Sequence, residues 1–280
     1  MISFDFEYYR PDTLDEAVNL YKQLDSHSKK PLYYGGGTEI ISMARMNNVY
    51  TEAIIDIKEI PECNKCESKN NELTIGSAVT LTKIAELNFF PLLSQTVERI
   101  ADHTIQDKIT LGGNLAGTII YREAVLPLMV SNAHISIANT EGVRKVPIME
   151  AFDKRIKLNH GELIVNVSID NHYLTLPFLH VKRTKNEKID YPLITIVALN
   201  NDGYIQLGLS GLCEYPFRST KLEKILNKDS KIKDTTITEA INSIPDEILN
   251  DIGGSSEYRK FMLHTMIRET IENLRGAANV

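Results

Sequence analysis

The stretch Tyr33-Tyr34-Gly35-Gly36-Gly37-Thr38-Glu39-Ile40 joins a short apolar run, residues 31–34, to a second one, residues 40–46. The first run predicts a buried strand and the second a helix, so the three glycines stand at a strand-to-helix junction. A second stretch, Thr110-Leu111-Gly112-Gly113-Asn114-Leu115-Ala116, precedes another apolar run, residues 124–130, that is expected to be helical. Two glycine loops in the same setting dominate the interpretation of this sequence.

A glycine loop that opens a helix is suited to binding a phosphate group. Without a Cβ atom the chain can approach the anion closely, and the unpaired N–H groups and dipole of the helix add to the attraction. One such loop is as readily a tight turn, whereas two favour a diphosphate. Neither loop continues as G-x-G-x-x-G or ends in Gly-Lys-Ser/Thr, so neither a Rossmann fingerprint nor a P-loop is predicted.

The remaining patterns divide the chain into three parts. A small α/β piece is expected over residues 1–55, a second over residues 56–160, and an antiparallel sheet packed with a helical cluster over residues 161–280. In the last part, Asn200-Asn201-Asp202-Gly203 predicts a hairpin turn, and helices are expected from residue 221 onward. The fold class is therefore α+β.

The composition is that of a globular protein able to bury a core, with 280 residues, of which 42% are hydrophobic. The net charge of -6 is spread along the chain without a basic block, which argues against nucleic acid or an anionic membrane surface as partner. Met1-Ile2-Ser3-Phe4-Asp5 lacks the basic and apolar regions of a signal peptide, and no apolar run is long enough for a spanning helix. A cytoplasmic location is expected.

Three cysteines, Cys63, Cys66 and Cys213, cannot supply the four thiolates of an iron–sulfur cluster or a structural zinc site. Cys63 and Cys66 have the spacing of a metal or redox pair, but they lie in a polar stretch without a second pair or a nearby histidine, which favours a plain loop. The scattered histidines show no paired ligand spacing, and the sequence has no nucleophile-elbow serine. No metal site is expected.

The order of the motifs resembles the FAD-binding subunits or domains of the molybdenum hydroxylases, the family of xanthine dehydrogenase and the carbon monoxide dehydrogenase medium subunit. The first glycine loop resembles that family's first FAD loop, and Thr110 to Asn114 resembles its T-[IL]-G-G-N signature. Further resemblance lies in Glu162-Leu163-Ile164-Val165, Tyr215-Pro216-Phe217-Arg218 and Ser255-Ser256-Glu257-Tyr258-Arg259, which follow in the family's order. The resemblance covers nearly the whole chain.

This resemblance implies the PCMH type of FAD-binding fold, in which two small α/β subdomains hold FAD ahead of a C-terminal antiparallel sheet with helices. The backbones of Tyr33–Ile40 and Thr110–Asn114 would hold the diphosphate and ribityl region of FAD. Glu123 stands where the family usually has a cofactor-binding aspartate, Ile164 would lie beside the flavin ring system, and Lys182 near the isoalloxazine or adenine. No catalytic side chain is expected, because the flavin supplies the redox chemistry.

The resemblance also implies partners: a molybdopterin subunit, an iron–sulfur subunit that passes its electrons to this FAD, and NAD or another acceptor. Two alternatives stay open, namely a stand-alone FAD-dependent oxidoreductase and a non-catalytic α+β domain whose glycine loops are only turns. Individual residues have alternatives too. Thr38 and Glu39 could cap the helix that follows them, Asn114 could be a turn residue, and either Tyr33 or Tyr34 could belong to the core.

Overall fold

The computed structural model describes residues 2–185 and 190–277. Its N-terminal part is a three-stranded parallel sheet with two helices. Its elements are β1 (Glu7–Tyr9), α1 (Leu14–Ser26), β2 (Leu32–Tyr34), α2 (Thr38–Arg45) and β3 (Ala53–Asp56). The strand order is β1-β3-β2, and both pairings are parallel. The carboxyl ends of the strands therefore meet at one edge of the sheet, from which the first glycine loop leaves β2.

The middle part is built on a five-stranded antiparallel sheet in the order β4-β5-β10-β6-β7. Its strands are β4 (Cys66–Lys69), β5 (Glu72–Gly76), β6 (His134–Asn139), β7 (Gly142–Pro147) and β10 (Leu163–Asp170), with a small hairpin of β8 (Phe152–Asp153) and β9 (Arg155–Ile156). Its helices are α3 (Pro61–Asn64), α4 (Leu81–Leu87), α5 (Pro91–Val97), α6 (His103–Gln106), α7 (Leu111–Ala116), α8 (Val125–Val130) and α9 (Ile148–Ala151). β10 is the central strand of this sheet, although it follows residue 160.

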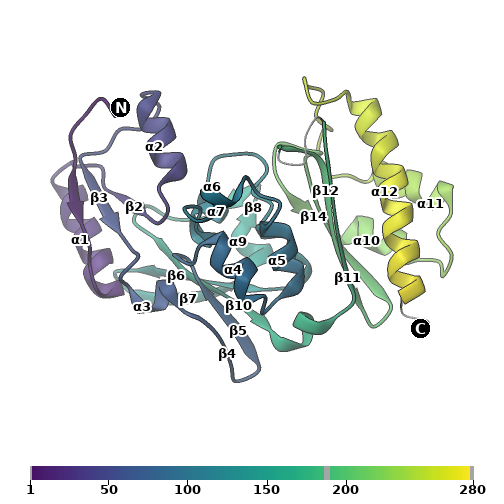
Figure 1. Ribbon diagram of the computed structural model, residues 1–280, viewed down its shortest axis with the longest axis horizontal. Coiled ribbons are helices and arrows are strands. Elements are labelled where there is room, and N and C mark those ends of the chain that lie inside the picture. Colours follow the sequence, from purple (N-terminus) through teal and green to yellow (C-terminus); the bar gives the residue numbers. More distant parts are fainter. Residues whose placement is uncertain (1, 186–189, 278–280) are drawn as a thin grey trace.

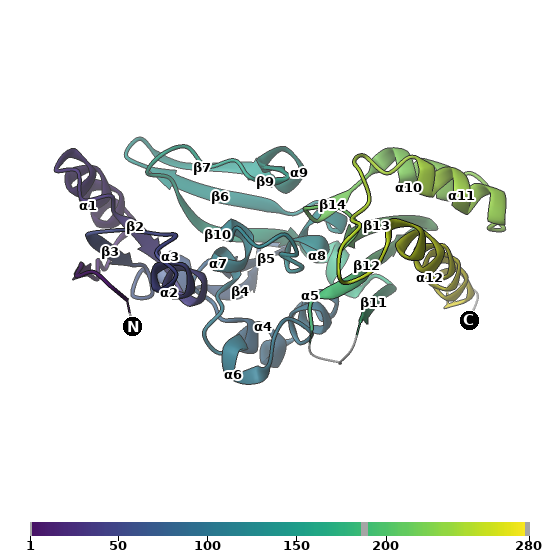
Figure 2. The same ribbon diagram turned by 90° about the horizontal axis from the view of Figure 1, so that it is seen from above.

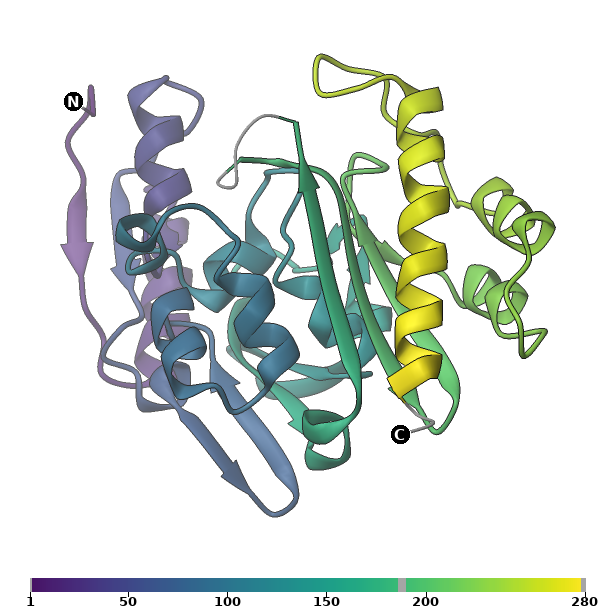
Figure 3. The ribbon, with the colours of Figure 1, turned by 45° about the vertical axis from the view of Figure 1, so that its right-hand side comes forward.

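The C-terminal part is a four-stranded antiparallel sheet. The helices that follow it in the sequence lie on one face of this sheet (Figures 2 and 3). A 3₁₀ turn (Asn171–Thr175) leads into β11 (Phe178–Thr184), β12 (Pro192–Asn201), β13 (Tyr204–Ser210), β14 (Phe217–Arg218), α10 (Thr220–Leu226), α11 (Asp234–Asn242) and α12 (Ser256–Ala277). α8, which belongs to the middle part, packs against the same sheet. Its Leu126 and Val130 lie so close to Gly208 of β13 that a Cβ atom there would stand 3.3 and 3.4 Å from them.

Three hydrophobic clusters hold these parts together in an elongated row (Figure 1). The N-terminal cluster joins Val18 and Ile55 to Ala138 and Val165 of the middle sheet, so the first sheet is anchored to the second. The largest cluster fills the middle part and reaches Val197 in β12. The third lies between the C-terminal sheet and α10, α11 and α12.

This architecture confirms the predicted α+β class, and it corrects two local predictions. Cys63 lies in α3 and Cys66 begins β4, so the plain loop expected there is wrong. Gly112 and Gly113 lie inside the first turn of α7 instead of in a loop before residues 124–130. Within the described ranges, no helix is both long and apolar enough to cross a membrane.

Candidate cofactor site

The first glycine loop begins α2 with an open N-terminus. Gly37 is the N-cap residue with φ 70°, a left-handed conformation that glycine adopts without strain, and no side chain caps the helix there. The ring of Tyr34 lies 2.0 Å from where a Cβ atom of Gly37 would stand, so the tyrosine fills that space. The first-turn N–H groups of an α-helix have no partner within the helix, which makes this end of α2 suited to an anion.

The second glycine stretch begins α7, and here the N-terminus is capped. The Thr110 hydroxyl accepts a hydrogen bond from the Gly113 N–H at 3.2 Å. Gly112 is buried against Ser77, since its Cβ atom would lie 2.5 Å from the Cβ of Ser77. Leu111 donates its N–H to the Val79 carbonyl at 2.9 Å, which ties the helix start to the neighbouring segment. The second stretch is therefore the more rigid of the two.

The first glycine stretch packs on the segment where the second stretch begins. A Cβ atom at Gly35 would lie 2.6 Å from the Thr110 hydroxyl, and one at Gly36 would lie only 1.6 Å from the Lys108 carbonyl oxygen. Glycine at these positions lets one loop pack on the other, so space for a phosphate group is not the only reason for it. This contact brings the two sequence motifs together, although Gly36 and Lys108 are 72 positions apart in the sequence.

Glu39 forms a second connection between the two segments. Its carboxylate accepts hydrogen bonds from the Thr118 N–H at 2.8 and 3.0 Å and from the Thr118 hydroxyl at 2.8 Å. The acid does not cap its own helix, which was one alternative, but links α2 to the segment that follows α7. Thr38 and Ile40 are half-buried in the first turn of α2, beside this link.

One buried polar atom at this site has no partner in the protein. The Oδ1 atom of Asn114, in α7, is buried and accepts no hydrogen bond from the residues that the structure describes. A buried acceptor without a donor costs about 1–3 kcal/mol, so a bound group that donates a hydrogen bond would remove this cost. FAD carries ribityl hydroxyls that can donate and a diphosphate that suits the open end of α2. The residues at the two loops therefore fit this cofactor.

Tyr33 and Ile164 pack into the interior of the described structure. The ring of Tyr33 stacks on Tyr21 of α1 at 4.9 Å, and its hydroxyl donates to the Gly161 carbonyl at 3.1 Å. Burial raises the pKa of Tyr33. Ile164 lies in β10 within the largest hydrophobic cluster. Of the two tyrosines, Tyr34 is the one that adjoins the first glycine loop.

Glu123 and Lys182 form a buried ion pair between the middle and C-terminal parts. Lys182 Nζ lies 2.8 Å from Glu123 Oε2 and 2.7 Å from the Arg99 carbonyl oxygen. The other carboxylate oxygen of Glu123 accepts a hydrogen bond from the Thr195 hydroxyl at 2.5 Å. The side chains of Glu123 and Lys182 are 4% and 1% exposed, so the structure pairs these two predicted cofactor residues with each other.

His180 lies beside this pair on β11, and its Nε2 atom is buried without a partner among the described residues. Burial, with the neighbouring positive charges of Arg99 and Lys182, lowers the pKa of His180 to about 4. The imidazole is therefore neutral at physiological pH.

Two residues at the first loop were missed by the sequence interpretation. Asp56 ends β3 next to Tyr34, and Lys58 Nζ donates to the Gly35 carbonyl at 3.1 Å. The available signal was a strand that ends in an acid with a lysine two residues later, at the carboxyl edge of a parallel sheet, where ligands commonly bind in open α/β sheets.

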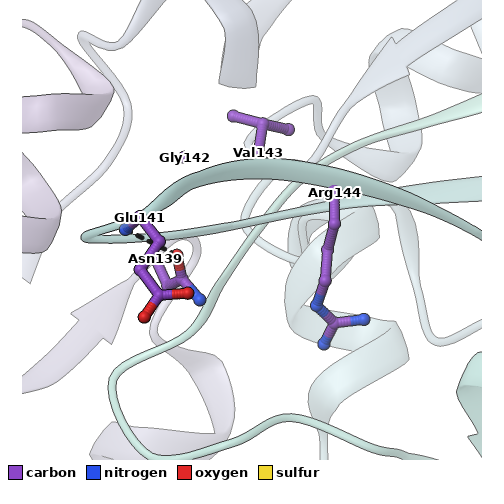
Figure 4. Close-up of a pocket in the computed structure, with 5 residues that line it drawn as sticks. All are labelled: Asn139, Glu141, Gly142, Val143 and Arg144. Carbon is purple, nitrogen blue, oxygen red and sulfur yellow. Dashed lines mark hydrogen bonds between the residues drawn. The ribbon is translucent and has the colours of Figure 1, made fainter.

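Two hollows in the described residues lie away from the glycine loops, one of them beside β11 between residues 175–179 and 273–274. The other, at the β6–β7 turn, is lined by Asn139, Glu141, Gly142, Val143 and Arg144 (Figure 4). Its arginine is engaged with Glu162, at 2.8 Å. In the ranges 2–185 and 190–277, no group of three or more histidine, cysteine or acidic side chains is placed to hold a metal ion. The paired glycine loops remain the candidate site.

Two glycine stretches packed together, one of them beginning a helix that no side chain caps, and an antiparallel sheet with helices behind them are an arrangement suited to a nucleotide cofactor. The model of the family described as the FAD binding domain in molybdopterin dehydrogenase matches residues 4–171. The chain belongs to this family, and as a member it is the FAD-binding component of an oxidoreductase. The matched region ends one residue after β10.

Relatives of this chain agree with that assignment over its whole length. The xanthine dehydrogenase FAD-binding subunit of Escherichia coli O157:H7 is 26% identical over 299 aligned residues, which cover 98% of each chain. Among solved structures, carbon monoxide dehydrogenase from Hydrogenophaga pseudoflava superposes with a TM-score of 0.87 at 22% identity, covering 99% of each chain. Quinoline 2-oxidoreductase from Pseudomonas putida 86 gives 0.84 at 20% identity, covering 98% of each chain. The predicted fold and family are confirmed.

Proposed function

We propose that this chain is the flavin subunit of a molybdopterin-dependent dehydrogenase or hydroxylase. It receives electrons from iron–sulfur clusters on a partner subunit and passes them from FAD to NAD or another acceptor. FAD supplies a centre that exchanges either one or two electrons, and the protein holds it and controls access to it. The observation that supports this proposal is the close packing of Gly35 and Gly36 on Lys108 and Thr110, which brings the two glycine motifs together.

The cysteines of the chain support the need for a partner that holds the clusters. Cys63, Cys66 and Cys213 each belong to, or pack against, a different hydrophobic cluster. Burial raises the pKa of Cys63 to about 11 and that of Cys213 to about 12, so neither thiol is a ready thiolate ligand. Three separated thiols do not make a cluster site, so the iron–sulfur centres belong to another chain.

Within the site we propose different tasks for the predicted residues. The open end of α2, from Gly37 to Ile40, would receive the diphosphate, and Asn114 would accept a hydrogen bond from a ribityl hydroxyl. Tyr34 and Thr110 would shape the two loops. Glu123 and Lys182, bonded to each other as an ion pair, would lie toward the flavin end of the cofactor. Tyr33 and Ile164 would support the site from the core.

The organisation of the whole chain follows from the same proposal. We propose three parts, as predicted, with the second extended from residue 160 to the end of β10 so that its sheet stays whole. We also propose that the complex works in the cytoplasm. The net charge of -6 without a basic block is consistent with small-molecule and protein partners.

The test is purification of the chain with whatever accompanies it. The expected result is a complex that releases FAD on denaturation and contains iron and molybdenum on chains other than this one. Turnover of a small substrate by the isolated chain would instead favour the stand-alone flavoenzyme. A chain that shows no flavin absorbance, alone and in its complex, would refute the proposal.

A further inference from the structure

Asp56 carries a buried negative charge at the carboxyl edge of the N-terminal sheet. Its side chain is 1% exposed, and it pairs across the sheet with Tyr34, the residue before the first glycine loop. The carboxylate accepts hydrogen bonds from the Tyr8 hydroxyl and from the Lys58 N–H, the latter at 2.9 Å. The bond to Asp56 raises the pKa of Tyr8 to about 12, so the tyrosine keeps its proton and remains a donor. A buried carboxylate with these donors is a fixed anchor.

Lys58 extends from this anchor to the first glycine loop. Its Nζ lies 2.6 Å from Asp56 Oδ2 and 3.1 Å from the Gly35 carbonyl oxygen, and it stands 4.6 Å from the centre of the Tyr34 ring. The same ring fills the space next to Gly37. Lys58 therefore holds the loop at both ends, directly at Gly35 and through Tyr34 at Gly37.

The lysine also changes the charge that the loop presents. A backbone carbonyl near a diphosphate would repel it, and Lys58 places a positive charge on that carbonyl. An exposed lysine–acid pair normally contributes little, because water screens both partners. Here the acid is buried and the lysine is 40% exposed, so the geometry of the pair is set by the protein while its ammonium remains at the surface of the loop.

We propose that Lys58, fixed by Asp56, is a positioning residue of the cofactor site that holds the first glycine loop in the shape that binds the diphosphate. The inference rests on the proposed FAD function and adds two residues to the site. Lys58 acts through Gly35 and Tyr34 and takes no part in the redox chemistry.

The test compares Lys58→Met with Lys58→Arg and a matched control in the full chain stripped of FAD. Lys65→Met is that control, because Lys65 is similarly exposed and pairs with an exposed acid, Glu67, at 2.6 Å. FAD affinity is measured by flavin fluorescence, and ADP, which carries a diphosphate without a flavin, is measured by competition. Lys58→Met is expected to weaken the binding of FAD and of ADP by the same factor, about tenfold. Lys58→Arg is expected to keep most of both affinities, and Lys65→Met to change neither.

A second variant separates positioning from folding. Because Lys58→Met leaves Asp56 buried without its cation, it can lower stability, whereas Asp56→Asn/Lys58→Met removes both charges. The double variant is expected to recover the melting temperature of the apo-protein and to keep the weakened affinities. Unchanged FAD and ADP binding in the double variant, or a loss for FAD alone, would overturn the inference. Absence of FAD from the wild-type protein would instead refute the proposed function, so the two failures are distinct.

Discussion

Replacing Gly36 with alanine tests the contact that makes one site of two loops. The new Cβ atom would stand 1.6 Å from the Lys108 carbonyl oxygen and 2.7 Å from its carbonyl carbon. Real contacts of this kind are essentially never shorter than 3.0 Å, so the two segments must part by about 1.4 Å or more. The neighbour is backbone and cannot rotate away, so the strain has to move one loop relative to the other.

The expected cost follows from this displacement. Overpacking of a well-packed contact costs about 1–3 kcal/mol. At about 2–4 °C per kcal/mol for a chain of this size, Gly36→Ala should lower the melting temperature of the apo-protein by about 2–12 °C. FAD affinity should fall as well, because the open end of α2 moves away from α7.

Gly113→Ala is the matched control for the loss of stability. Its Cβ atom would meet only the Thr110 hydroxyl, at 2.9 Å, on a side chain that can rotate. Weakening of this cap destabilises the protein by about 1 kcal/mol, and alanine in place of a helical glycine stabilises it by about the same amount. The melting temperature should therefore change by less than about 2 °C.

Both variants are measured by thermal unfolding with and without FAD and by titration of the apo-protein with FAD. Since Gly113 is exposed on the α7 side of the site, its alanine variant should weaken FAD binding without loss of stability. If Gly36→Ala melts and binds FAD like the wild type, the two loops are not in contact and the argument for a single site is wrong.

Three further predictions concern buried polar groups. Asn114→Ala removes the unpartnered acceptor, so FAD binding should weaken about five- to tenfold in a titration while the apo-protein becomes no less stable, because the cost of the buried acceptor is removed too. Glu123→Gln leaves the ammonium of Lys182 buried without its counter-charge, which should cost about 3–5 kcal/mol in urea unfolding, and Glu123→Gln/Lys182→Met should recover most of it. A single variant as stable as the double one would contradict this. The pKa of His180 in the folded protein, about 4, lies below its ordinary value near 6.5. The contribution of the neutral imidazole to the free energy of unfolding is therefore complete above about pH 6.5 and is lost as the pH falls toward 4. Between pH 7 and pH 5 the loss should be about 2 kcal/mol, and His180→Leu should remove this part of the pH dependence.

Local signals in the sequence were sufficient for most of the fold. Strand-to-helix punctuation located α2, though not its glycine N-cap, and Asn200 to Gly203 marked the β12–β13 hairpin. The order of the motifs predicted the family, and the match of the family model to residues 4–171 confirms it. These features depend on neighbouring residues, so a single sequence contains them.

Contacts between distant segments could not be predicted in the same way. The sequence predicts that the glycines at 35 and 36 make room for a phosphate, but in the structure Lys108 and Thr110 occupy the space beside them. Glu123 and Lys182 were each predicted to face the cofactor, and no pattern in the sequence showed that they pair with each other across 59 residues. Such pairings depend on how β11 and the segment that leads into α8 are brought together, which local periodicity does not encode.

The close approach of Gly36 to Lys108 also sets an order of events during synthesis. At about 5–20 residues per second, the 72 residues that separate them take the ribosome about 4–15 seconds to add. The N-terminal sheet can form in that interval, but its glycine loop has no neighbour to close against. FAD would therefore join a chain whose middle part has already emerged and packed against the first sheet, and the vitamin-derived cofactor becomes a late addition to a site that both parts enclose.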